Sequence, residues 1–132
     1  RALAPMLLAP FVARAQPAWP TRPVRMVIPW APGGGVDIMG RLLGTRLAEQ
    51  TGQPFAVDNR TGGGGVVGFG EAARAAPDGA TLLVLDNSYA MLPHITANLP
   101  FGRARAFAPA ALIGSAPFML VVNAASRFDS LA

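Results

Sequence analysis

Two glycine-rich turns constrain the fold of this chain more than any other feature. They span residues 32–37 (Pro-Gly-Gly-Gly-Val-Asp) and residues 59–65 (Asn-Arg-Thr-Gly-Gly-Gly-Gly). Each follows a short apolar run typical of a β-strand and precedes a segment with helical character. A helix start leaves its first N–H groups unpaired and carries a partial positive charge. Because glycine also lets a ligand approach the backbone closely, the two turns predict a pocket for an anionic group.

Apolar runs alternate with helical segments along the chain. Strands are predicted at residues 24–29, 55–58, 81–85, 111–114 and 118–122. Helices are predicted at residues 36–51 and 66–76, with a weaker stretch through Leu92 and Ile95; an apolar stripe of the first helix comprises Met39, Leu42, Leu43 and Leu47. The alternation predicts an α/β fold with a parallel sheet. Ligands of such sheets bind beyond the carboxyl ends of the strands, where both turns and residues 86–88 fall.

The composition excludes several classes of site. The chain has 132 residues, no cysteine and a single histidine, His94, so disulfides, thiolate metal sites and multi-histidine metal sites are excluded within it. All eleven cationic residues are arginines and stand singly. This scatter, without interleaved aromatic residues, does not support nucleic-acid binding.

The first fifteen residues have the pattern of a secretion signal. Arg1 precedes the apolar run 2–13, and Ala13-Arg14-Ala15 is a small-x-small cleavage site. Two prolines inside the run argue against a buried helix. We therefore expect residues 1–15 to be a truncated signal peptide and the protein to be exported to the periplasm.

A dinucleotide site is the alternative interpretation of the second turn. Gly63-x-Gly65-x-x-Gly68 fits the Rossmann fingerprint, with Asp86 near the position of a ribose-binding acid. This would make the protein an NAD(P)-dependent oxidoreductase. Residues 58–61, however, separate the strand from the glycines, and another strand and helix come first. The chain also has no P-loop and no nucleophile motif, so we expect no enzyme.

Four further residues have two interpretations each. Asp37 either stabilises the helix start or orients the loop and receives a ligand group. Arg60 either pairs with Asp58 or solvent, or binds a ligand carboxylate. Trp30 is either a packed aromatic or a wall of the pocket. His94 either has a packing or surface role, which we expect, or acts as a ligand.

The motifs together resemble one receptor family. The run 27–37 (Val-Ile-Pro-Trp-Ala-Pro-Gly-Gly-Gly-Val-Asp) is similar to the first strand and loop of the Bug/TctC-type receptors of tripartite tricarboxylate transporters. The resemblance continues in order through residues 52–54, 58–65, 76–83 and 107–109. It covers essentially all of residues 19–132.

The resemblance implies a type II periplasmic-binding-protein fold, a two-domain clamp that closes on a small organic carboxylate. Residues 16–123 would form the first lobe and residues 124–132 the start of a second lobe that this chain lacks. The implied ligand-binding residues are Trp30, Ala31, Gly33, Gly34, Gly35, Asp37, Gly62, Gly63, Gly64, Gly65, Asn87 and Ser88. No cofactor or metal is implied. The implied partners are the ligand and the membrane subunits of the transporter, and the receptor would be a monomer.

Two positions depart from the family pattern. Asp86 stands where the family usually has a small residue, and an acid there would repel a carboxylate unless it points away or pairs with an amine. Ala106 replaces the acid commonly found before Phe-Ala-Pro, a difference we expect to be structural.

Overall fold

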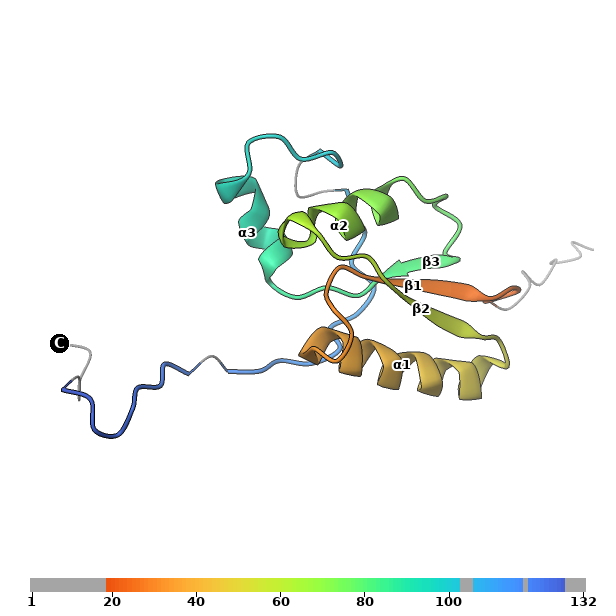
Figure 1. The fold of residues 1–132 in the computed structure, drawn as a ribbon. Helices are drawn as coiled ribbons and strands as arrows, with labels where there is room; N and C mark the ends of the chain where they lie inside the picture. The colour runs from red at the N-terminus through yellow and green to blue at the C-terminus, as the bar shows by residue number, and fades with distance from the viewer. Residues whose placement is uncertain (1–18, 103–105, 118, 128–132) are drawn as a thin grey trace, which may run out of the picture.

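The computed structural model describes residues 19–102, 106–117 and 119–127, and it contains a three-stranded parallel sheet between helices (Figure 1). The predicted signal peptide lies outside the described residues. The strands are β1 (Val24–Ile28), β2 (Phe55–Asn59) and β3 (Thr81–Leu83), in the order β2-β1-β3. The parallel α/β prediction is confirmed.

Strand β1 is the centre of the sheet. Its apolar side chains Val24, Met26, Val27 and Ile28 are 0–1 % exposed, as expected for a strand covered on both faces. It pairs with β2 over five positions, from Val24 opposite Phe55 to Ile28 opposite Asn59, and with β3 over three. Strand β3 is shorter than predicted, although the Val84 N–H still donates to the Val27 carbonyl at 3.0 Å.

Helix α1 (Gly35–Thr51) covers one face of the sheet. Gly52 ends it in the left-handed conformation, as predicted, and its N–H donates to the Ala48 carbonyl. The predicted apolar stripe is wrong in part, because Met39 and Leu42 are 40 % and 55 % exposed. The helix instead buries Gly40 and Gly44. A Cβ on Gly40 would lie 2.5 Å from Ile28 Cδ1. Because helix and sheet lie so close together, α1 packs on the sheet with the face that carries its glycines.

The opposite face of the sheet carries α2 (Val66–Ala73), which follows the short 3₁₀ turn η1 (Gly63–Gly65), and α3 (Ser88–Ile95) lies beyond it (Figure 1). Helix α2 ends three residues earlier than predicted. Phe69 of α2 is fully buried and makes edge-to-face contacts with Tyr89 of α3 and with Phe101. These aromatic contacts hold α3 against α2.

The two strands predicted at residues 111–114 and 118–122 do not form among the described residues there. The segment has no regular structure: it passes the sheet and the start of α1 before it leads away from the fold, and Leu112 and Leu120 are 87 % and 78 % exposed (Figure 1). A strand needs a neighbour to pair its N–H and C=O groups. Within the described part of the chain β3 pairs with β1 alone. The two runs therefore have the composition of strands but are not hydrogen-bonded to a neighbouring strand. No helix in that part is long and apolar enough to cross a membrane.

Gly68→Ala should strongly destabilise the fold. A Cβ there would lie 2.7 Å from the Arg60 carbonyl oxygen and 2.9 Å from Pro29 Cα, so backbone must move. We expect a loss of about 3 kcal/mol in the free energy of unfolding, measured by urea denaturation. The control is Gly52→Ala, where φ is 71° and no atom lies within 4 Å; it should cost about 1 kcal/mol. Equal losses for the two variants would contradict the packing assigned to Gly68.

Candidate anion-binding site at the carboxyl edge of the sheet

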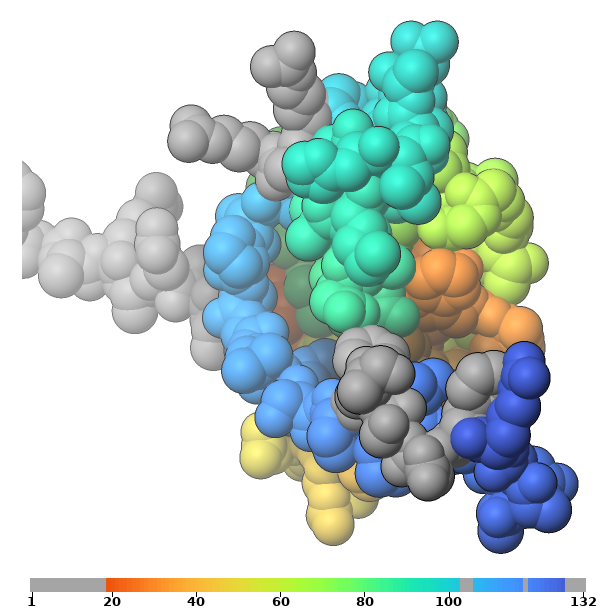
Figure 2. Space-filling model, turned by 90° about the vertical axis from the view of Figure 1, so that its left-hand side faces the viewer, coloured from red at the N-terminus to blue at the C-terminus, as the bar shows by residue number. Residues whose placement is uncertain are grey.

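Both glycine turns leave the sheet at the same edge. Ile28 and Asn59, the last residues of β1 and β2, are opposite each other, and the Arg60 N–H donates to the Ile28 carbonyl at 2.8 Å. The first turn follows β1 after Pro29 and Trp30, and the second follows β2 directly. Figure 2 looks onto this edge, where the orange segment after β1 and the yellow-green segment after β2 lie side by side. The predicted meeting of the turns is therefore confirmed.

The first turn has three N–H groups without a partner among the described residues. Gly34 is the N-cap of α1, and the first helical hydrogen bond is from the Ile38 N–H to the Gly34 carbonyl. No side chain caps this helix start, which leaves the N–H groups of Gly35, Val36 and Asp37 unpaired. The Gly33 N–H, by contrast, donates to Asp37 Oδ2 at 2.9 Å. Gly33 therefore shapes the turn instead of offering a donor.

The second turn also combines exposed and buried glycines. Gly62, Gly63 and Gly64 are exposed, all three have positive φ, and no described group accepts from their N–H groups. Gly65 is buried: its N–H donates to the Gly62 carbonyl at 3.0 Å, and a Cβ on it would meet the Phe69 ring at 2.6 Å. The turn thus presents up to three backbone N–H donors, those of Gly62, Gly63 and Gly64, while Gly65 packs against α2.

The loop after β3 reaches the same edge, but the donors of its Ser88 are occupied. Asp86 Oδ1 accepts a hydrogen bond from the Ser88 N–H at 3.1 Å and another from the Ser88 hydroxyl. The Asp86 carboxylate is thereby turned onto its own loop, as in an Asx turn. Asn87 is exposed, and its side chain has no hydrogen-bond partner among the described residues. Of this loop, Asn87 is the residue free to meet a ligand.

Asp37 lies beneath the first turn and is 3 % exposed. Its Oδ2 accepts from the Gly33 N–H and from Arg41 Nε, both at 2.9 Å, and its Oδ1 accepts from Asn59 Nδ2 at 2.9 Å. These donors, Arg41 first, hold the pKa of Asp37 well below its usual range. The geometry favours the loop-orienting role of Asp37.

Asn59 and Arg41 were not predicted as site residues. The signals available were the i,i+4 spacing of Asp37 and Arg41 on a helix and the place of Asn59 at a strand end. Neither signal is specific before the strand register is known.

The remaining candidates have structural partners. Arg60 Nε lies 2.9 Å from Asp58 Oδ1 and 3.4 Å from Glu71 Oε2. Of its two interpretations, the structure therefore supports pairing with Asp58. Trp30 packs on the core of Met26, Ile28 and Val84, and its buried indole N–H has no hydrogen-bond partner among the described residues. Its ring is a wall of the core next to the first turn.

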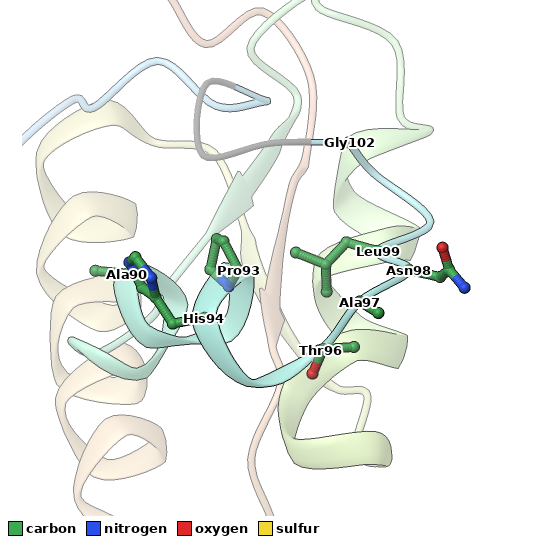
Figure 3. A pocket seen from close by; sticks show the side chains of 8 residues that line it. All are labelled: Ala90, Pro93, His94, Thr96, Ala97, Asn98, Leu99 and Gly102. Atoms are coloured by element: carbon green, nitrogen blue, oxygen red, sulfur yellow. The ribbon is translucent and has the colours of Figure 1, made fainter.

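His94 lines a separate hollow of about 650 Å³ between α3 and the loop 96–102 (Figure 3). Its other lining residues are uncharged, and neither glycine turn contributes to it. Over the residues that the structure describes, no group of three or more His, Cys, Asp or Glu side chains could hold a metal ion.

Residues 39–132 match the family described as tripartite tricarboxylate transporter family receptor. The chain belongs to this family. BugT of Bordetella pertussis is 36 % identical over 115 residues, which cover 86 % of this chain and 35 % of BugT. The chain thus spans about a third of the length of this relative.

Solved structures agree with the assignment. The periplasmic binding protein BugD superimposes with a TM-score of 0.60 and 34 % identity over 64 % of this chain and 28 % of BugD. Rpa4515 of R. palustris, solved with adipate, gives a TM-score of 0.53 and 38 % identity over 54 % of this chain and 24 % of Rpa4515. The periplasmic-binding-protein fold predicted from sequence is confirmed for the part covered. The family is one of receptors, in agreement with a non-enzymatic protein, and nothing in the comparisons supports a dinucleotide-binding oxidoreductase.

Asp37→Asn should lower stability more at neutral pH than in acid. Because folding lowers the pKa of Asp37, its ionised form stabilises the fold above the ordinary carboxyl pKa of about 4, and this contribution is lost as the pH falls further. Urea denaturation at pH 7 and pH 3 should therefore show a stability gap between wild type and variant that narrows at pH 3. A gap of constant size would contradict the hydrogen bonding assigned to this carboxylate.

Proposed function

We propose that this chain forms the first lobe of a periplasmic solute-binding receptor that traps a small organic carboxylate between two lobes. The observation that supports this proposal most is the pair of exposed turns whose unpaired N–H groups lie at one edge of the sheet. Unpaired N–H groups at a helix start bind carboxylate oxygens without a cationic side chain. The pairing of the nearby arginines agrees with binding by backbone N–H groups, because Arg41 and Arg60 already form ion pairs with acids of the chain.

The class of ligand is supported by a relative of known structure. Rpa4515, which shares 38 % identity with this chain where they align, was solved with adipate. A dicarboxylate places one carboxylate on the first lobe and leaves the other for a second lobe. We propose that residues 16–123 belong to the first lobe and residues 124–132 begin the second. Gly35, Gly62, Gly63, Gly64 and Asn87 are the proposed contacts; Trp30, Ala31, Gly33, Gly34, Gly65 and Ser88 shape their surroundings.

The remaining partners follow from the family. We propose that the receptor is exported by the signal at residues 1–15, acts as a monomer and delivers its ligand to the membrane subunits of a tripartite transporter. The family match supports the delivery to a tripartite transporter, and the periplasmic relatives support the export.

Calorimetric titration of a full-length protein carrying this sequence tests the proposal. Succinate, glutarate and adipate should be compared with NAD⁺ and NADP⁺. We expect saturable binding of at least one dicarboxylate and none of the dinucleotides. Binding of a dinucleotide with no response to any dicarboxylate would overturn the receptor function in favour of the oxidoreductase.

Gly35→Ala should weaken carboxylate binding without unfolding the protein. Gly35 is exposed, its backbone is helical, and a Cβ there would meet no atom within 4 Å, so the added methyl group crowds only the space outside the turn. We expect at least a tenfold higher Kd for adipate, or for whichever of the three acids wild type binds, with an unchanged Tm. Gly52→Ala at the other end of α1 is the control and should lower the Tm with Kd unchanged. A lower Tm with an unchanged Kd in Gly35→Ala would contradict a role of Gly35 in binding.

A further inference from the structure

Asp37, Arg41 and Asn59 form a closed ring of hydrogen bonds. Arg41 Nε donates to Asp37 Oδ2 at 2.9 Å, and Arg41 Nη2 donates to Asn59 Oδ1 at 3.0 Å. Asn59 Nδ2 closes the ring by donating to Asp37 Oδ1 at 2.9 Å. Two members lie in the first two turns of α1 and the third is the last residue of β2, so the ring joins the start of α1 to the carboxyl end of β2, 22 residues from Asp37 to Asn59.

Two further hydrogen bonds connect the ring to the first glycine turn. Asp37 Oδ2 accepts from the Gly33 N–H at 2.9 Å, and Asn59 Nδ2 donates to the Trp30 carbonyl at 3.0 Å. Both ends of the loop between β1 and α1 are therefore held by the ring. Asn59 is also the first residue of the second turn, so the position of one turn is tied to the position of the other.

The charges of the ring also suit an anion. An isolated carboxylate under an anion-binding turn would repel the ligand. Here Asp37 is 3 % exposed, whereas its partner Arg41 is 52 % exposed and compensates the charge. The carboxylate is buried and already accepts from three donors within the chain, so it orients the loop and is not placed to accept directly from a ligand amine.

We propose that Asp37, Arg41 and Asn59 are positioning residues that hold the two glycine turns in the carboxylate-receptive arrangement before a ligand arrives. The expected effect of these residues on ligand affinity rests on the proposed function. Its structural part, the coupling of the two turns, does not depend on which ligand binds. Preorganisation of this kind lowers the ordering cost of binding and therefore raises affinity.

The test uses two isosteric substitutions in the full-length protein. Asn59→Asp places an oxygen against Asp37 Oδ1 and against the Trp30 carbonyl, which breaks two of the hydrogen bonds at constant size. The double variant Asp37→Asn with Asn59→Asp lets the amide at 37 donate to the carboxylate at 59 and keeps an acid beside Arg41. Restoration by the second substitution separates a positioning role from a general loss of packing.

Asp78→Asn is the matched control. Like Asp37, Asp78 accepts from a backbone N–H, that of Ala80 at 2.9 Å, and from an arginine, Arg22. It lies just before β3 begins, at the end of the sheet opposite the turns. Its substitution removes similar hydrogen bonds without touching the ring.

Amide hydrogen exchange and adipate titration are the two readouts. For Asn59→Asp we expect at least tenfold faster exchange at Gly33 and Gly65, whose N–H groups are bonded within the two turns, and at least a tenfold rise in Kd. The double variant should recover part of both losses, because it restores a hydrogen bond between positions 37 and 59 but leaves the Trp30 carbonyl without its donor, and Asp78→Asn should show neither. Unchanged exchange and Kd in Asn59→Asp would overturn the proposal, as would losses in Asp78→Asn of the same size. If wild type binds no dicarboxylate, the proposed function fails, and the exchange rates alone still decide whether the ring couples the turns.

Discussion

Strand β1 is hydrogen-bonded on both sides, and the position of every functional segment follows from that pairing. Its register with β2 places Ile28 opposite Asn59, and its pairing with β3 extends to the bond between Val84 and Val27. All three strands run in the same direction, so all three following loops leave from one edge. A shift of one residue in the register would reverse the faces of β2 and separate Asn59 from Asp37.

The glycines at this edge divide into two roles. Some are needed for packing: Gly40 and Gly44 let α1 approach the sheet, Gly65 leaves room for the Phe69 ring, and Gly68 lets α2 approach Pro29. Others, such as Gly35 and Gly64, have open space where a side chain would be. The packed glycines bring two helix starts close together, and the open ones leave the backbone donors there accessible. A carboxylate can then be bound by backbone dipoles alone.

Much of this organisation could be predicted from the sequence. Periodicity and glycine punctuation gave the three strands of the sheet, α1 with its stop at Gly52, and the meeting of both turns. The buried face of α1 was not predictable, because Met39 and Leu42 form an apolar stripe while the contact surface is made of glycine. Residues 111–114 have strand composition, but composition cannot supply the neighbouring strand that pairing requires.

The candidate site was predicted as a set of segments more accurately than as a set of atoms. The sequence shows that Gly33 and Ser88 lie in the loops, but not that Asp37 and Asp86 accept from their N–H groups. The ring of Asp37, Arg41 and Asn59 depends on a pairing between distant strands, which no local pattern encodes. Asp86, the departure from the family pattern, is turned onto its own loop, so it need not oppose a bound anion.

The central claim is that unpaired N–H groups of the two turns bind one carboxylate together. Titration of the ¹⁵N-labelled full-length protein with adipate, followed through its backbone amide resonances, tests it most directly. We expect the amides of Gly35, Val36, Gly63 and Gly64 to shift together along one binding curve, while that of Gly33 stays bonded to Asp37. Adipate binding that shifts amides elsewhere and leaves both turns unchanged would contradict the claim.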